Sequence, residues 1–247
     1  MSLLLIAAIG LVIGFLGGLL GKGGSAIATP LLHAMGVPAI VAVAAPLPAT
    51  VPSTAVASYA YWRERFVDWR VVRWSIGIGV PCTVFGAVLT RWVGGGALVW
   101  ATDLVLVALG LRVLLGASTP STSVVDTADP SPAKLAAVAG GVGIVSGLLA
   151  NSGGFLLAPL FITVLRLPIK AALATSLAVA CVLAVPGTIV HAALGHIDWT
   201  VVAVFAATSV PFSFLGARIA IRTEAHRVER FYGLALMVLG LTFLAIS

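Results

Sequence analysis

Charged side chains are scarce in this sequence. Asp, Glu, Lys and Arg make up 9% of its 247 residues, and 60% of the residues are hydrophobic. A soluble domain carries roughly 25% charged residues because its surface faces water, so we expect most of this surface to face lipid. The few acids leave a net charge of +6. Because the basic residues lie in short loops between apolar runs, as in membrane proteins, no nucleic-acid partner is expected.

The sequence also lacks the signatures of common enzymes. It contains no H-E-x-x-H, G-x-S-x-G or Walker motif, and its four histidines are scattered. Its two cysteines, Cys82 and Cys181, both lie inside apolar segments. We expect them to be small buried side chains, with a disulfide or a metal pair as the alternative. We therefore predict no catalytic residue, no metal site and no cofactor.

A fixed offset of 130 residues relates the two halves of the chain. The matching pairs include Gly23-Gly24 with Gly153-Gly154, Pro38 with Pro168, Asp68-Trp69 with Asp198-Trp199, and Val80-Pro81 with Val210-Pro211. Chance rarely keeps one register over such a length. A duplicated, apolar chain with glycine and proline at matching positions is typical of secondary transporters.

Each half contains five apolar segments, which predict an all-α integral membrane protein. They are 2–21, 26–36, 38–62, 71–92 and 97–115 in the first half, and 134–150, 155–166, 168–193, 199–219 and 229–246 in the second. The long segments reach the roughly 20 residues that a membrane-spanning helix needs, but the second segment of each half does not. We expect the first two segments of each half to form a hairpin or broken helix with a Gly-rich tip. Whether the short segments cross the membrane is left open.

The sequence predicts two transmembrane repeats, 1–116 and 134–247, joined by a Ser/Thr/Pro-rich flexible linker, 117–133. If each half crosses the membrane an odd number of times, the second half is inverted relative to the first. Twelve basic residues then fall on one face and Arg91 alone on the other. Parallel halves would split the basic residues almost evenly. Because basic loops concentrate on the cytoplasmic side, we expect inverted repeats with both termini outside the cytoplasm.

The two Gly-rich tips are the first candidate substrate site. The candidate residues are Lys22, Gly23, Gly24 and Ser25 in the first tip and Asn151, Ser152, Gly153 and Gly154 in the second. A helix that begins at such a break directs its N-terminal N–H groups at an anion, and Lys22 adds a positive charge. Two alternatives are that the glycines only allow close helix packing, and that Lys22 is an interfacial anchor.

The third segment of each half supplies candidate hydroxyl groups. Thr175 and Ser176 open it in the second half, and Thr50, Ser53 and Thr54 lie among prolines in the first. Proline frees a helix carbonyl, so hydroxyls beside such breaks can line a polar path. The alternative is that each hydroxyl bonds back to its own helix.

Asp103 and His191 are the candidates for proton coupling. Asp103 is the only acid well inside a predicted spanning segment, where a charge is costly and usually functional. His191 aligns with Tyr61 near the predicted membrane surface, where a lone histidine is more often an interfacial structural residue than a proton carrier. Facilitated diffusion without protons therefore stays an alternative. The Asp-Trp pairs, Asp68-Trp69 and Asp198-Trp199, are expected to cap the fourth segments and anchor them with interfacial indoles.

Two motifs occur in both halves: a Gly-rich turn followed by proline, and a hydrophobic residue before Asp-Trp. A third motif, an A-x-x-T-S segment, occurs in the second half. They occupy Gly17 to Pro30 and Phe66 to Trp69 in the first half, and Gly147 to Pro159, Ala172 to Ser176 and Ile197 to Trp199 in the second. This combination resembles the sulfite exporter TauE/SafE family, also called the toluene sulfonate uptake permeases. The first half departs from it, with Ala45-Pro46 where the second half has Thr175-Ser176.

The resemblance implies a multi-pass secondary transporter, with export favoured, for small sulfur-containing anions such as sulfite or organosulfonates in the bacterial inner membrane. The alternative is a channel or carrier for another small ion or metabolite, such as a carboxylate or a metal cation. A membrane-embedded enzyme has no support from the residues. The expected partners are a small anionic substrate and the lipid bilayer. The oligomeric state is left open, with a homodimer among the options.

Overall fold

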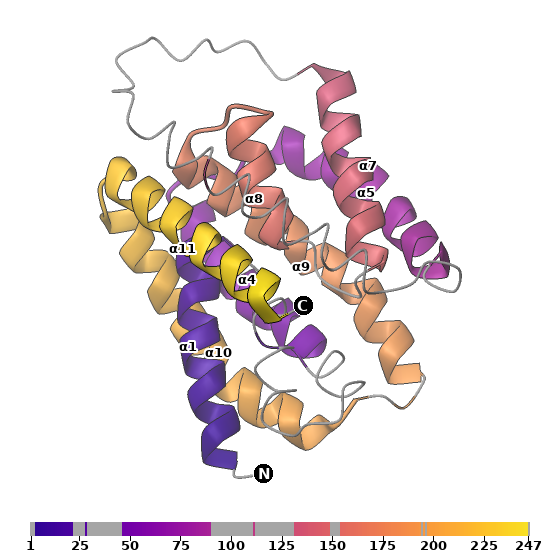
Figure 1. Cartoon of the computed structure of the whole chain (residues 1–247), viewed down its shortest axis with the longest axis vertical. Helices are drawn as coiled ribbons and strands as arrows, with labels where there is room; N and C mark the ends of the chain where they lie inside the picture. Colours follow the sequence, from indigo (N-terminus) through magenta and orange to yellow (C-terminus); the bar gives the residue numbers. More distant parts are fainter. Residues whose placement is uncertain are drawn as a thin grey trace.

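The computed structural model describes residues 3–21, 28, 46–89, 111, 131–148, 154–193, 195 and 197–246, and these residues form eight helices and no strand. The helices are α1 (Leu3–Leu20), α4 (Pro46–Arg63), α5 (Trp69–Leu89), α7 (Pro132–Leu148), α8 (Gly154–Thr163), α9 (Ile169–Ala193), α10 (Trp199–Arg222) and α11 (Ala225–Ile246). The predicted all-α class is confirmed (Figure 1).

Three of the described helices are long and apolar enough to cross a membrane: Leu3–Leu20, Ile169–Ile189 and Trp199–Arg222. Helix α8 has only 10 residues. At 1.5 Å per residue it is about 15 Å long, which is about half the thickness of a bilayer's hydrocarbon core. The short second segment of the second half therefore does not cross the membrane as one straight helix.

The helices α5 and α10 begin at matching positions of the two halves. Helices α5 and α10 start at Trp69 and Trp199, which are 130 residues apart. Helix α7 starts at Pro132, two residues before the predicted end of the linker. Proline is favoured in the first turn of a helix, where its missing N–H has no partner to lose. The rest of the linker, 117–130, lies outside the described residues.

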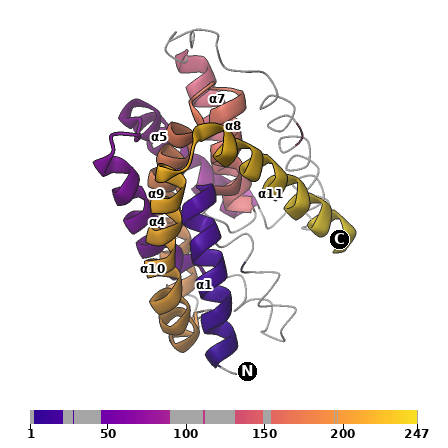
Figure 2. The ribbon, with the colours of Figure 1, turned by 90° about the vertical axis from the view of Figure 1, so that its left-hand side faces the viewer.

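Helices from opposite halves pack against each other in a reciprocal way. Helix α1 packs along α10, and α7 packs along α5. The helix of the first segment in each half thus meets the helix of the fourth segment in the other half. Helix α4 packs against both α9 and α10, and α9 also contacts α5 and α8. Figure 2 shows the α1–α10 pair side by side, with α11 extending obliquely away from it. The principal core, around Tyr61, Phe161 and Leu173, lies between α4, α8 and α9.

The equivalent helices α4 and α9 cross in opposite directions. The sulfur of Cys181 lies 3.5 Å from the carbonyl oxygen of Val51, and a side chain at Gly187 would touch Leu47. The numbering thus rises along α9 while it falls along α4. Cys181 and Val51 are themselves 130 residues apart, so each helix meets its own equivalent at this crossing. Both cysteines, Cys82 and Cys181, are free thiols and only partly buried.

Aspartate caps begin the fourth helix of each half, as predicted. Oδ1 of Asp68 accepts hydrogen bonds from the N–H groups of Arg70 and Val71, at 2.9 and 3.1 Å. Oδ1 of Asp198 accepts from Thr200 and Val201, at 2.9 and 3.2 Å. The following indoles, Trp69 and Trp199, are 53% and 61% exposed, as expected of interfacial anchors.

We expect Asp198→Ala to lower the free energy of unfolding by about 1 kcal/mol, because two N–H groups of the first turn of α10 lose their acceptor. Asp198→Asn is the matched control, since asparagine caps a helix about as well as aspartate. The measurement is the unfolding of the detergent-purified protein. Equal stabilities of the two variants would contradict the assigned cap.

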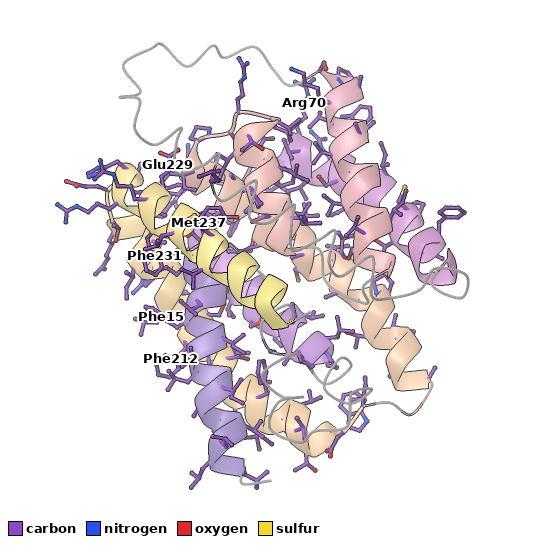
Figure 3. All side chains as sticks on the ribbon, in the orientation of Figure 1. Phe15, Arg70, Phe212, Glu229, Phe231 and Met237 are labelled. Carbon is purple, nitrogen blue, oxygen red and sulfur yellow. The ribbon has the colours of Figure 1, made fainter. Side chains whose placement is uncertain are left out.

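Basic residues collect at one end of the helix bundle. In Figure 1 the ends of α4 and α10 and the beginnings of α5, α7, α9 and α11 lie in the upper part of the view, opposite the N-terminus. Arg70 marks this end in Figure 3. The described basic residues at these helix ends are Arg63, Arg65, Arg70, Arg73, Lys134, Arg166, Lys170, Arg218, Arg222, Arg227 and Arg230. We call this region the basic end; Arg91 and Arg112 lie outside the described residues.

Candidate functional site

The first Gly-rich tip starts at the C-terminal end of α1. Gly21 follows the last residue of α1 with a φ of +66°, a left-handed conformation that favours glycine. The predicted site residues Lys22, Gly23, Gly24 and Ser25 lie outside the described residues. In the second tip, Asn151, Ser152 and Gly153 also lie outside them. Gly154 is described, buried, and is the first residue of α8.

Ser176 joins the first tip to α9. Its Oγ lies 2.8 Å from the carbonyl oxygen of Gly21 and 2.9 Å from that of Leu173, so the hydroxyl donates toward both. A Cβ added to Gly21 would lie 2.8 Å from Ser176 Oγ and 2.9 Å from Leu173 Cα. The end of α1 therefore rests directly on α9, and its contact has no room for a side chain.

Thr175 joins the same part of α9 to α5. Its Oγ1 accepts a hydrogen bond of 3.0 Å from the N–H of Asp68, and the carboxylate of Asp68 caps α5. Thr175 and Ser176 are both fully buried. The Thr-Ser pair of the second half thus holds two first-half motifs together, the Gly-rich tip and the Asp-Trp pair.

The depth of this junction follows from its place on α9. Ser176 is seven residues after Ile169, where α9 begins at the basic end. Seven residues of helix span about 10 Å, so the contact with Gly21 lies about two turns inside the basic end. Both hydroxyls are already engaged with protein atoms, so in this arrangement they position the tip. Their predicted direct contact with a substrate stays a prediction.

The hydroxyls of α4 lie mostly along their own helix. Thr50 Oγ1 donates to Pro46 O at 2.8 Å, and Thr54 Oγ1 donates to Thr50 O at 2.7 Å. These bonds match the alternative in which each hydroxyl bonds back to its own helix. One bond crosses between helices, from Ser213 Oγ on α10 to Ser53 O at 2.9 Å. A polar seam thus follows α4 inside the bundle.

Sequence reasoning missed three contacts between the halves: Gly21 with Ser176, Asp68 with Thr175, and Ser213 with Ser53. It also missed Ser209, whose buried hydroxyl has no hydrogen-bond partner among the described residues. The backbone of Ser209 lies against Gly14 of α1. The available signal was the spacing of Ser209 and Ser213, which lie one helical turn apart in the apolar middle of α10.

The two coupling candidates are only partly described. Asp103 lies outside the described residues, and His191 lies in α9 with its side chain not described. The described residues contain no group of three or more His, Cys, Asp or Glu side chains that could hold a metal ion.

Comparison with known proteins identifies the family. Residues 6–243 match the sulfite exporter TauE/SafE family. The chain belongs to this family. It is similar to a "Probable membrane transporter protein" of Xylella fastidiosa strain 9a5c, with 29% identity covering 97% of this chain and 94% of the relative. It is also similar to the "Probable membrane transporter protein YunE" of Bacillus subtilis, with 23% identity covering 89% of this chain and 87% of that protein.

Membership of the TauE/SafE family gives the class of protein. The chain is a membrane transporter and not an enzyme, and it is a multi-pass protein of the cell inner membrane. The resemblance predicted from the Gly-rich, Thr-Ser and Asp-Trp motifs is confirmed over nearly the whole chain. No solved structure matches the chain significantly.

Proposed function

We propose that this protein is a secondary transporter that exports small sulfur-containing anions, such as sulfite or organosulfonates. Membership of the sulfite exporter family supports the substrate class. The observation that carries the proposed site is the junction at Ser176, where the first Gly-rich tip meets the Thr-Ser segment of the other half. A substrate held at that tip lies between the two halves, as alternating access requires.

The anion site in this proposal consists of the two tips. Lys22, with Gly23, Gly24 and Ser25, supplies a positive charge and N–H groups at the first tip. Asn151, Ser152 and Gly153 supply the second, where α8 begins at Gly154. The N-terminus of a helix has unpaired N–H groups and a partial positive charge, which favour a bound anion. Ser176 contributes by holding the first tip in place, and Thr175 by fixing Asp68 at the start of α5 beside it.

The two halves are proposed to be inverted repeats. The opposite directions of the equivalent helices α4 and α9, at Cys181 and Val51, support this arrangement. The reciprocal pairs α1–α10 and α5–α7 support it as well. The concentration of eleven described basic residues at one end supports a cytoplasmic location for that end, by the positive-inside rule. In alternating access one half would then move against the other.

The substrate class can be tested by ligand-dependent stability. We expect sulfite or an organosulfonate to stabilise the detergent-purified protein against heat, while acetate and divalent cations leave it unchanged. A ligand at 100 times its dissociation constant adds about 2.7 kcal/mol to the free energy of unfolding. Lys22→Ala should remove this effect. Stabilisation by divalent cations alone would overturn the anion proposal and favour a cation carrier.

A further inference from the structure

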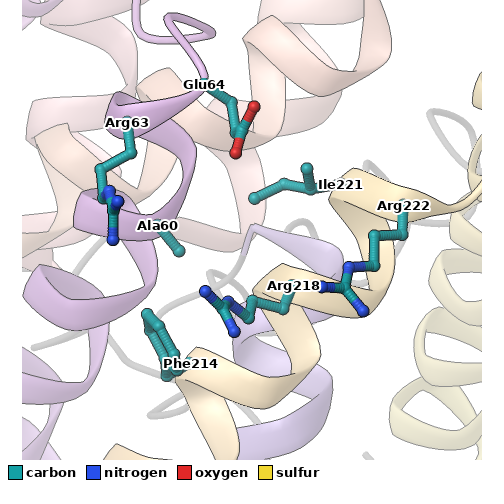
Figure 4. A pocket seen from close by; sticks show the side chains of 7 residues that line it. All are labelled: Ala60, Arg63, Glu64, Phe214, Arg218, Ile221 and Arg222. Atoms are coloured by element: carbon teal, nitrogen blue, oxygen red, sulfur yellow. The ribbon is translucent and has the colours of Figure 1, made fainter.

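A basic pocket lies between the C-terminal ends of α4 and α10, apart from the Ser176 junction. It has a volume of about 240 Å³. Its lining residues are Ala60, Arg63 and Glu64 from the end of α4, and Phe214, Arg218, Ile221 and Arg222 from α10. Figure 4 shows Arg63 and Arg218 directed toward the same space from the two helices, with Glu64 on the wall beyond. Three cations and one anion therefore share a single small cavity.

These charges are not neutralised by one another. Within the described part of the chain, no ion pair joins Glu64 to Arg63, Arg218 or Arg222. Elsewhere, Glu224 forms ion pairs with His226 and Arg227 at the start of α11. The guanidinium of Arg218 lies 5.1 Å from the centre of the Phe214 ring, within the range of a cation–π contact. Arg63, Arg218 and Arg222 are exposed side chains that line the same pocket, so a bound anion would face three positive charges.

Two carbonyl groups at the end of α10 receive hydrogen bonds from residues other than arginine. Lys170 Nζ donates to Ile221 O at 2.7 Å. The N–H and the hydroxyl of Thr223 both donate to Ile219 O, at 2.9 and 2.7 Å. Carbonyl groups at this helix end thus have donors other than arginine. The pocket arginines remain available for another acceptor.

The position of the pocket indicates where that acceptor comes from. Tyr59 and Trp62 on the last turns of α4 are 51% and 50% exposed, with ring centres 5.7 Å apart. Exposed tryptophan and tyrosine at helix ends mark the level of the lipid headgroups. Trp62 immediately precedes Arg63, so the pocket lies at the same level. Basic pockets between helices on the cytoplasmic side are suited to anionic headgroups.

We propose that this pocket binds a tetrahedral oxyanion group, supplied either by the phosphate of an anionic lipid or by a free anion. Arg63, Arg218 and Arg222 form its planar donors, since guanidinium groups pair with two oxygens of such a group at once. Glu64 opposes binding and limits its strength. The site does not depend on the proposed transport site at the tips.

The test measures stabilisation of the detergent-purified protein by three probes: phosphatidylglycerol, phosphatidylcholine and inorganic phosphate. Stabilisation by phosphatidylglycerol but not by inorganic phosphate assigns the site to lipid. Equal stabilisation by inorganic phosphate assigns the site to a free anion. In either case we expect Arg218→Gln to weaken apparent binding about tenfold, the loss typical of one charged hydrogen bond. Glu64→Gln should strengthen binding, because it removes the opposing charge.

Two controls separate this site from other basic surfaces. Arg230→Gln removes an exposed charge of the basic end on α11, outside the pocket, and should leave binding unchanged. Lys22→Ala should also leave the binding of these three probes unchanged, because Lys22 belongs to the proposed transport site at the first tip. The proposal is overturned if no probe stabilises the protein, if phosphatidylcholine acts as well as phosphatidylglycerol, or if Arg230→Gln weakens binding as much as Arg218→Gln.

Discussion

Gly18→Ala is expected to destabilise the protein by about 1–3 kcal/mol, the usual cost of forcing extra atoms into a packed interface. A Cβ on Gly18 would lie 2.7 Å from the carbonyl carbon of Ser213 and 3.0 Å from the backbone nitrogen of Ala217. One on Gly14 would lie 2.5 Å from Ser209 Cα. Because these neighbours are backbone atoms, only a displacement of the whole α1 helix from α10 can accommodate the added carbon.

Gly77→Ala is the matched control for this prediction. Gly77 lies inside α5, and a Cβ there would meet no atom within 4 Å. Alanine at an exposed helix position is favoured over glycine by roughly 0.5–1 kcal/mol, so this variant should be slightly more stable than the wild type. Replacing glycine by alanine is thus expected to lower the stability at residue 18 and to raise it at residue 77. Unfolding midpoints that shift in the same direction for both variants would contradict the described α1–α10 packing.

Gly21→Ala is expected to reduce transport at least tenfold, the second large effect. The residue has a φ of +66°, and its new Cβ would lie within 2.9 Å of Ser176 Oγ and Leu173 Cα. The first tip would therefore be displaced from α9, and the hydrogen bond from Ser176 to Gly21 O would be lost. If the tip holds the substrate, displacing it impairs the site directly. The measurement is anion flux in reconstituted vesicles, corrected for the amount of folded protein.

Gly195→Ala separates the displacement of the tip from backbone strain. Gly195 has a φ of +70°, and a Cβ there would meet no atom within 4 Å. Both variants carry the cost of a left-handed alanine, about 1–2 kcal/mol, but only Gly21→Ala carries the clash. We expect Gly195→Ala to transport like the wild type. Equal losses of transport in the two variants would show that the contact of the tip with α9 has no special role.

Local signals in the sequence were sufficient to predict where α5 and α10 begin. Trp69 and Trp199 begin α5 and α10 because the preceding aspartates cap them, and these caps are local chemistry. The composition of the linker does not mark the start of α7, because its Ser/Thr/Pro-rich stretch continues into Pro132, a residue that helices accept in their first turn.

Contacts between the halves could not be predicted from the sequence. The bond from Ser176 to Gly21 joins residues 155 positions apart, and that from Asp68 to Thr175 joins residues 107 positions apart. Spacing identified Thr175 and Ser176 as polar residues in an apolar segment, and a substrate-facing role was the simplest hypothesis. The packing gives both hydroxyls partners in the first half, which depends on how α1, α5 and α9 pack together.

The most direct test of the account is sulfite flux into vesicles that contain the purified protein. We predict gradient-driven uptake well above that of protein-free vesicles, reduced at least tenfold by Lys22→Ala and unchanged by Gly195→Ala. An imposed pH gradient should change the rate only if Asp103 or His191 couples transport to protons. Sulfite and organosulfonate flux no greater than in protein-free vesicles would contradict the proposed substrate class, and full flux by folded Lys22→Ala protein would contradict the proposed site.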